Sequence, residues 1–212
     1  WATTPKRSFR PGNTMSPDSE TVRLFAAIEL PPRAKVELGQ MASNLRARCS
    51  GSSLKWVAMD SIHLTLKFLG ETRSSQIDAV QEAAAASCIG TGELSLALGR
   101  VGAFPSSSRP RVVWVGLEGD IPGLVSLAGR LDRGLQALGF RPEERPFSPH
   151  LTIARVRPDA SLQEQAEIGA ALSRARPPAS LRFTASEVSL IRSQLRPEGP
   201  LYTCLARWPL ST

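Results

Sequence analysis

The sequence predicts an α+β fold with largely antiparallel sheets, arranged as two lobes on either side of a central cleft. Three observations lead to this prediction. Segments with strand-like alternation and segments with helical periodicity interleave along the chain. The tripeptide His-Leu-Thr occurs once in each half, at His63 and His150, which are the only two histidines among 212 residues. A chain of this length can also bury one large core or two smaller ones.

The first element is a buried strand over residues 22–30, which ends at Pro31 and Pro32. Prolines suit the first turn of a helix, so we expect one to begin here. Its apolar residues fall on one helical face: Ala34, Leu38, Met41, Ala42 and Leu45.

Two further strands are expected over residues 54–59 and 61–70, with a turn between them. The next helix covers residues 76–88, and Ser74 or Ser75 can cap it. Its apolar stripe consists of Ile77, Val80 and Ala84.

The middle of the chain predicts a hairpin and the clearest helix. Strands over 92–105 and 111–119 are joined by a polar link with the composition of a turn. The helix follows over 121–140, with Gly139 as its terminator. Leucines recur along it with helical spacing at Leu124, Leu127, Leu131, Leu135 and Leu138.

The second histidine begins a strand over residues 150–156, after a proline-rich link. Ser161 and Glu164 form a capping box for a helix that ends near Arg174. Two strands close the chain: 181–191 and 201–208.

The composition favours an anionic partner. The formal net charge is +7, with 22 Arg and 4 Lys, and such a surplus is typical of proteins that bind nucleic acid. No block of five or six like charges occurs, so a general bias toward Arg stays open as the explanation of the positive charge.

No apolar run approaches the length of a membrane span. Three cysteines without a Cys-x-x-Cys spacing predict free thiols in a reducing cytoplasm: Cys49, Cys88 and Cys204.

Residues 1–20 are polar and have no hydrophobic centre, so they do not resemble a secretory signal. We expect a disordered arm, a remnant of cloning, or upstream sequence before a native start at Met15. Residues 21–212 are expected to form one bilobal domain.

Alternation along a strand places residues two apart on the same face. In the first motif, one face is apolar and needs a core: Ile62, Leu64, Leu66 and Phe68. The other face carries His63, Thr65 and Lys67. In the second motif, the core face carries Leu151 and Ile153, and the other face carries His150 and Thr152. Each motif therefore presents an imidazole and a hydroxyl side by side.

Two imidazoles can serve as general base and general acid at neutral pH without a metal. Two hydroxyls and a nearby cation can hold the oxygens of a phosphodiester. Lys67 is a candidate for such a contact, although a solvated lysine is an alternative. Phe147, just before the second motif, can stack on a base, although a place in the core is an equal alternative.

The segments HLTLKFLG and PHLTIAR resemble the paired HxTx motifs of the two-histidine (2H) phosphoesterase superfamily. Within it, the chain looks like the RNA 2′,3′-cyclic phosphodiesterases, also called 2′–5′ RNA ligases. The segments RLFAAIELPP, RVVWVGL and SQLRPEGPLYTCLARWPL carry the likeness beyond the motifs, so that it covers nearly all of residues 22–210.

This resemblance implies a bilobal 2H-phosphoesterase fold, with two antiparallel sheets, flanking helices and one motif on each side of the cleft. It implies that the catalytic residues are His63, Thr65, His150 and Thr152. Arg155 corresponds to the arginine that helps to hold the phosphate, although strand parity puts it off the face of His150. By analogy, His150 is the base on water and His63 is the acid on the leaving 3′-oxygen.

The same resemblance implies hydrolysis of RNA 2′,3′-cyclic phosphate ends to 2′-phosphates, with no metal and no cofactor, by a cytoplasmic protein that we expect to be a monomer. Some such enzymes also join tRNA halves, so tRNA fragments are candidate partners. A relative acting on 2′–5′ oligoadenylate or on a cyclic ADP-ribose phosphate is an alternative, as is a non-catalytic RNA-binding module. Structural or metal-ligating histidines are less favoured, because no carboxylate lies at ligand spacing beside either one.

Overall fold

A computed structural model describes residues 20–49, 53–175, 182–197 and 199–211. The predicted N-terminal arm therefore lies outside the described residues, apart from Glu20. The strands are β1 (Thr21–Glu29), β2 (Leu54–Trp56), β3 (His63–Arg73), β4 (Leu94–Ser106), β5 (Arg109–Gly119), β6 (His150–Val156), β7 (Arg182–Ala185), β8 (Glu187–Arg196) and β9 (Gly199–Pro209). The helices are α1 (Pro32–Arg46), α2 (Ile77–Cys88), α3 (Ile121–Gln136) and α4 (Leu162–Arg174).

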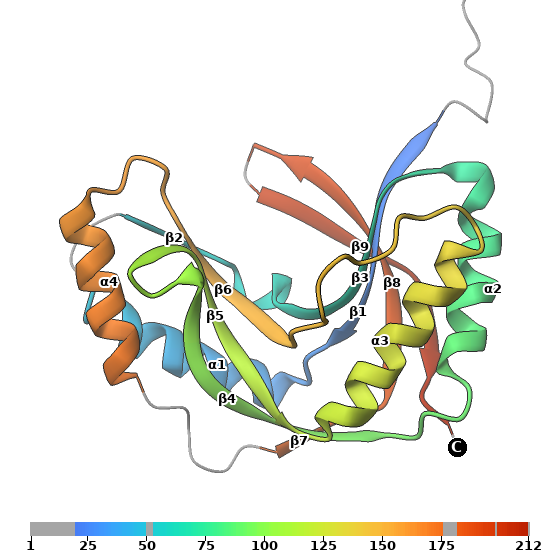
Figure 1. The fold of residues 1–212 in the computed structure, drawn as a ribbon, viewed down its shortest axis with the longest axis horizontal. Helices are drawn as coiled ribbons and strands as arrows, with labels where there is room; N and C mark the ends of the chain where they lie inside the picture. Colours follow the sequence, from blue (N-terminus) through green and yellow to red (C-terminus); the bar gives the residue numbers. More distant parts are fainter. Residues whose placement is uncertain (1–19, 50–52, 176–181, 198, 212) are drawn as a thin grey trace, which may run out of the picture.

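Two antiparallel sheets carry the two motifs, as predicted. The first has the order β3-β1-β8-β9, and the second has the order β2-β6-β5-β4-β7. β3 carries His63 in the first sheet, and β6 carries His150 in the second. Helices α2 and α3 lie side by side next to the first sheet, and α4 packs on β4 and β5 of the second (Figure 1). No helix in the described part of the chain is long and apolar enough to cross a membrane.

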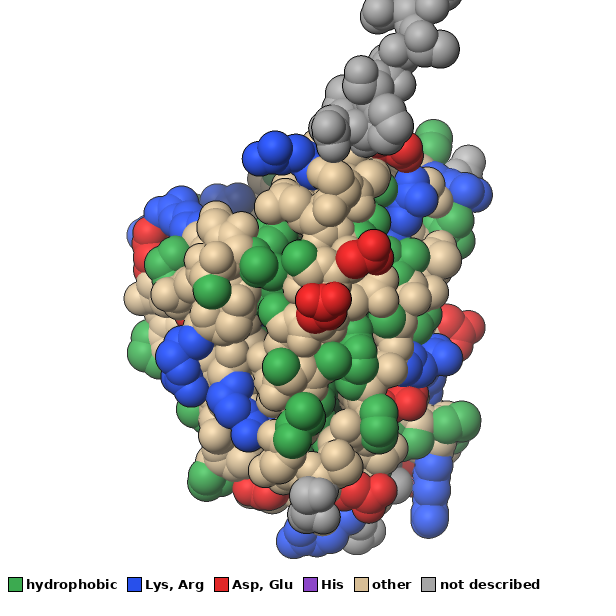
Figure 2. All heavy atoms as spheres, turned by 90° about the vertical axis from the view of Figure 1, so that its right-hand side faces the viewer, with side chains coloured by type: hydrophobic (Ala, Val, Ile, Leu, Met, Phe, Trp, Pro, Cys, Tyr) green, Lys and Arg blue, Asp and Glu red, His purple; other side chains and the backbone are tan. Residues whose placement is uncertain are grey.

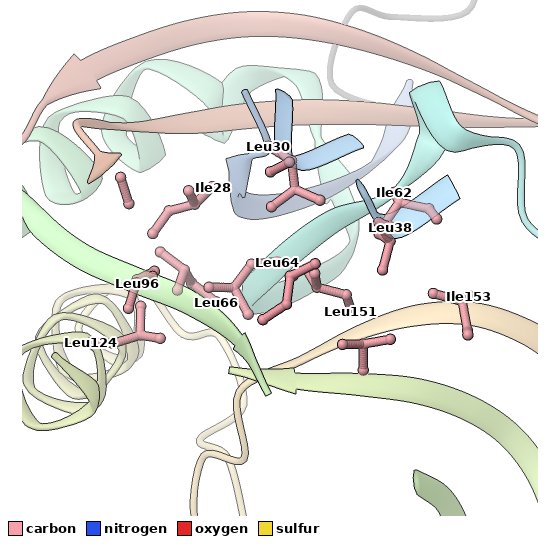
Figure 3. Packing of buried hydrophobic residues seen from close by; sticks show 14 of the residues in the cluster. Ile28, Leu30, Leu38, Ile62, Leu64, Leu66, Leu96, Leu124, Leu151 and Ile153 are labelled. Atoms are coloured by element: carbon pink, nitrogen blue, oxygen red, sulfur yellow. The ribbon is translucent and has the colours of Figure 1, made fainter. Parts of the chain in front are cut away.

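The apolar core joins the two sheets. Leu64 and Leu66 of β3 are buried in the same cluster as Leu151 and Ile153 of β6, and Leu124 of α3 belongs to it as well (Figure 3). These side chains lie between the strands that present the two motifs. Burial of each large apolar side chain contributes roughly 1.5–3 kcal/mol, so the packing between the motif strands is strongly specified.

Most predicted elements are confirmed, with small differences in their ends. Helix α1 buries the five residues expected from its periodicity. Helix α3 buries four of the five predicted leucines, and Leu138 lies just beyond its end, before Gly139 at φ 87°. The capping box of Ser161 and Glu164 at the start of α4 is present. The predicted hairpin is formed by β4 and β5.

Two expectations were wrong. Neither Ser74 nor Ser75 caps α2, because both lie in a 3-10 turn and the Ser74 hydroxyl donates instead to the carbonyl of Glu20. The predicted strand over 181–191 is two strands, β7 and β8, which belong to different sheets; Leu181 itself lies outside the described residues. The two strands expected either side of a turn near Asp60 are present as β2 and β3, and they belong to different sheets, since β2 pairs with β6 and β3 pairs with β1.

Candidate active site

The strands β3 and β6 have the same sequence of burial over their first seven residues. From each histidine onward, residues are alternately half-buried and buried for four positions, then buried again, exposed and buried. This places His63 and Thr65 on one face of β3, and His150 and Thr152 on the corresponding face of β6, as predicted. All four line one cleft of about 830 Å³ between the sheets.

The shared pattern comes from an irregularity at the same place in both strands. On β3, Thr65 and Lys67 face consecutive residues of β1, so Leu66 is an extra residue. On β6, Thr152 and Ala154 face consecutive residues of β5 in the same way. An extra residue of this kind is a β-bulge, and it turns the residues directly after it to the opposite face. On β3 a second shift follows at Leu69.

The bulge in β3 makes the prediction for Lys67 wrong. Lys67 does not share the face of His63 and Thr65; it is 3% exposed and forms ion pairs with Asp132 and Glu143 on the other side of the strand. Phe68 points toward the cleft in place of Lys67. It is 60% exposed and lines the cleft instead of the core. Both errors follow from counting parity through the bulge.

The bulge in β6 brings Arg155 onto the cleft. Strand parity put this residue off the face of His150 and Thr152, but the extra residue at Ile153 turns it outward. Arg155 is exposed and lines the cleft. Burial raises the pKa of the nearby Tyr202 phenol on β9, and the charge of Arg155 reduces this increase. Arg155 thus lines the same cleft as both histidines.

Phe147 occupies the alternative place that the sequence left open. It is half-buried and packs against the main core cluster. It is not among the residues that line the cleft in the described part of the chain.

Both imidazoles are held in the same way. The Nδ1 atom of His63 lies 2.9 Å from the carbonyl oxygen of Ser61, and Nδ1 of His150 lies 2.7 Å from that of Ser148. A carbonyl oxygen only accepts, so Nδ1 carries hydrogen in both rings. In the neutral ring, Nε2 therefore keeps its lone pair for proton transfer. The shared Ser-x-His-Leu-Thr spacing in the sequence is the signal for this feature.

Aromatic rings surround His63 more closely than His150. Phe25 stacks on His63 with centroids 4.5 Å apart, and Tyr202 meets it edge-on at 5.2 Å. Burial lowers the pKa of His63 to about 4, although the Ser61 carbonyl and the Glu29 carboxylate both act to raise it. His63 is therefore neutral at pH 7 in the free protein. His150 has one ring beside it, Phe104, edge-on at 5.0 Å.

The lining of the cleft includes a set of cations, called the cationic wall below, and a set of apolar side chains, called the apolar wall. Among the residues that the structure describes, this lining includes four cations and no carboxylate: Arg23, Lys55, Arg155 and Arg196 are the cations. The apolar side chains include Phe68 together with Leu195, Pro200, Leu201 and Tyr202 of the β8–β9 hairpin. On the α2 side of the molecule, in contrast, basic, acidic and apolar side chains are interspersed (Figure 2). Sequence reasoning missed the hairpin, because nothing local places it opposite the motifs.

A metal centre has no support among the residues that the structure describes. They contain no group of three or more His, Cys, Asp and Glu side chains that could hold a metal ion. Glu29 on β1 is paired with His63 on β3. Its carboxylate accepts hydrogen bonds from Ser189 and Arg207.

The chain is similar to known proteins over most of its length. The profile of the 2′-5′ RNA ligase superfamily matches residues 30–196. RNA 2′,3′-cyclic phosphodiesterase of Methanocaldococcus jannaschii is 28% identical over 187 residues, covering 88% of this chain and 100% of that protein. RNA 2′,3′-cyclic phosphodiesterase of Methanothermobacter thermautotrophicus is 32% identical over 183 residues, covering 86% of this chain and 95% of that protein.

Solved structures show the same architecture. The crystal structure of Escherichia coli LigT in apo form matches with a TM-score of 0.74 and 29% identity, covering 92% of this chain and 100% of that chain. LigT has also been crystallised with 3′-AMP, and that structure matches with a TM-score of 0.72. Together with the paired motifs on facing sheets, these similarities lead to one conclusion: the chain belongs to the 2′-5′ RNA ligase superfamily.

Proposed function

We propose that this protein hydrolyses RNA 2′,3′-cyclic phosphate ends to 2′-phosphates, without a metal, by general acid–base catalysis between His63 and His150. The observation that carries the proposal is the pair of equivalent strands, which present two imidazoles and two hydroxyls to one cleft from opposite sheets. The relatives named RNA 2′,3′-cyclic phosphodiesterase support the same reaction.

In the proposed reaction, water attacks phosphorus and forms the new P–O bond, while the bond from phosphorus to the 3′-oxygen breaks. His150 takes the proton from water, and His63 gives a proton to the 3′-oxygen. Thr65 and Thr152 donate hydrogen bonds to the non-bridging oxygens. Each proton-transfer group is expected to contribute roughly 10²–10⁴-fold in rate.

The free protein holds His63 neutral, so the acid must gain its proton when substrate binds. A phosphodiester anion within about 4–6 Å favours the charged imidazolium and raises its pKa. Burial beside Phe25 makes this response large, because charge interactions are strong where water is excluded. The low pKa of His63 is therefore compatible with its role as the acid in the complex.

The cationic wall supports a phosphate-bearing ligand. Lys55 on β2 and Arg155 on β6 are directly opposite each other in the sheet, and both line the cleft. Like charges in directly opposed positions are unfavourable unless something neutralises them. A cyclic phosphate with the adjoining RNA phosphates supplies that neutralisation, with Arg23 and Arg196 farther along the wall.

The apolar wall supports a ligand that carries a base. The ring of Phe68 lies 6.0 Å from that of Phe25, which in turn stacks on His63. A base attached to a ribose beside the histidines is therefore within reach of the exposed Phe68 ring. Stacking accepts any base, because every base has a π face.

The same groups can carry out the ligation for which the superfamily is named. A 5′-hydroxyl in place of water attacks the cyclic phosphate, the 3′-oxygen leaves, and the product is a 2′–5′ phosphodiester. Hydrolysis is our primary proposal, because water needs no second binding site.

Since one chain supplies all four motif residues, we propose that a single subunit suffices for the reaction. The three free cysteines support a reducing, cytoplasmic setting.

The test uses a short RNA with a 2′,3′-cyclic phosphate end, incubated with the protein in excess EDTA. The products are separated so that 2′-phosphate and 3′-phosphate are distinguished. We expect conversion to the 2′-phosphate alone, and a loss of roughly 10²–10⁴-fold in both His63→Ala and His150→Ala. No turnover, or turnover that both variants retain, would falsify the proposal.

Two additions separate the alternatives. A 2′–5′ oligoadenylate and an ADP-ribose cyclic phosphate are assayed beside the RNA. If kcat/KM is higher for one of them than for the RNA, that compound is the preferred substrate. RNA binding that weakens with salt and survives both histidine substitutions, without turnover in the parent protein, would instead identify a binding module.

A further inference from the structure

The ammonium group of Lys67 is fully occupied on the side of β3 away from the cleft. Its Nζ atom lies 2.7 Å from Oδ1 of Asp132 on α3 and 3.3 Å from Oε1 of Glu143. It also donates to the backbone carbonyl of Arg141 at 2.7 Å. An ammonium has three N–H donors, and these three acceptors use all of them.

The acceptors lie along the route that leads to His150. Arg141 and Glu143 belong to residues 137–149, which leave α3 and run across the molecule into β6 (Figure 1). Asp132 also accepts the backbone N–H of Glu143 at 3.2 Å, so the helix and this segment are joined at the point where Lys67 meets them. Burial raises the pKa of Asp132, but hydrogen bonds from Lys67 and Glu143 lower it by more, and the carboxylate stays charged.

The segment between this anchor and the histidine is short and stiff. Two prolines lie between Glu143 and His150, at 146 and 149, and each fixes the backbone φ angle at its position; Pro142 lies within the anchor itself. Its last residues hold the ring directly, because Nδ1 of His150 donates to the carbonyl of Ser148. The fixed φ angles therefore limit how much of a displacement at Glu143 the segment can absorb before it reaches His150.

We propose that Lys67 is a positioning residue, which ties the strand of His63 and Thr65 to the segment that delivers His150 and so sets the gap between the two imidazoles. The proposal rests on the proposed function, since it concerns the geometry of that reaction. A misplacement of about 1 Å from a change outside the reacting groups can cost about a hundredfold in rate. Lys67 touches no substrate in this role.

The kinetic test is Lys67→Met, which keeps the length of the side chain and removes its donors. We expect kcat for the cyclic phosphate to fall by about a hundredfold while KM stays within about threefold. The matched control is Arg130→Met. Arg130 is a half-buried cation on α3, but it donates to the Ile89 carbonyl and the Thr91 hydroxyl just after α2, so its loss is expected to lower stability and leave kcat unchanged.

A second readout does not depend on turnover. Because the chain has only two histidines, His63→Gln and His150→Gln assign both imidazole Cε1–H resonances in the NMR spectrum. In folded Lys67→Met, we expect the His150 resonance to shift or broaden and that of His63 to move much less. In Arg130→Met, both are expected to stay in place. The NMR comparison decides the role of Lys67 even if the parent protein does not hydrolyse the RNA. In that case the proposed function fails, but the positioning role is still tested.

Unchanged histidine resonances in Lys67→Met overturn the positioning role, whether or not kcat falls. If Lys67→Met does not fold, Glu143→Ala decides the question, because this side chain is 53% exposed and its loss removes one of the two contacts between Lys67 and the segment, leaving the one to the Arg141 carbonyl. A shift of the His150 resonance in the same direction, with a smaller fall in kcat, supports the proposal; the absence of both overturns it.

Discussion

Phe68 and Arg155 occupy equivalent positions in two strands of different sheets. Each lies five residues after its histidine, beyond a bulge at the same place, and each points into the cleft. The two halves of the site therefore share a backbone plan but differ in chemistry at this position. One half offers an exposed aromatic ring, and the other offers a guanidinium. A ligand with a flat apolar end and an anionic end fits this difference.

The first prediction separates these two contributions. Phe68→Ala is expected to raise KM for a nucleoside 2′,3′-cyclic phosphate through the loss of roughly 1–3 kcal/mol of stacking. It is expected to leave the hydrolysis of ribose 2′,3′-cyclic phosphate, which has no base, unchanged. Arg155→Met is expected to impair both substrates, because both carry the phosphate. Steady-state kinetics on the two substrates check this, and an equal loss in Phe68→Ala on both would contradict a base-stacking role.

The same bulges mark the limit of what the sequence could predict. Alternation correctly paired His63 with Thr65 and His150 with Thr152, because the irregularity begins only after each threonine. It misplaced Lys67 and Phe68, since an extra residue in one strand is defined only against the partner strand. Likewise, β7 and β8 are continuous in sequence pattern but pair in different sheets. Periodicity reports local amphipathicity, whereas pairing depends on residues that are distant in the chain.

The second prediction concerns stability against pH. The folded protein lowers the pKa of His63 from 6.5 to about 4, so the unfolded chain binds more protons between these values. The stabilisation is thus complete above pH 6.5 and is lost as pH falls toward 4. Its size is at most about 3 kcal/mol, at ~1.36 kcal/mol per pKa unit.

Urea unfolding of the parent protein and of His63→Gln, measured from pH 4 to 7, tests this contribution. We expect the difference in unfolding free energy between the two proteins to grow with pH from about 4 to 6.5 and to level off above that. A difference that stays constant would show that His63 is not kept neutral by its surroundings in the folded state.

The third prediction is that phosphate binding raises the pKa of His63. In the free protein, NMR titration is expected to give a midpoint for His63 of about 4. Saturation with a 2′-nucleotide, the proposed product, is expected to move this midpoint upward, because the anion stabilises the imidazolium. If the nucleotide saturates the protein and the midpoint does not move, His63 does not face the phosphate and cannot be the acid on the 3′-oxygen.

The fourth prediction distinguishes RNA from a mononucleotide as the ligand of the cationic wall. Arg23 and Arg196 line the cleft apart from the motif strands, on β1 and at the end of β8. If they contact phosphates upstream of the cyclic end, Arg23→Gln and Arg196→Gln raise KM for an RNA oligomer but not for a nucleoside 2′,3′-cyclic phosphate. Each is also expected to reduce the slope of log affinity against log salt for the oligomer by about 1.

Arg182→Gln is the control for both substitutions. This exposed arginine lies on β7, at the edge of the second sheet opposite β2, and does not line the cleft. Equal losses on both substrates would place these arginines on the cyclic phosphate itself, and the cleft would then recognise a mononucleotide-sized ligand.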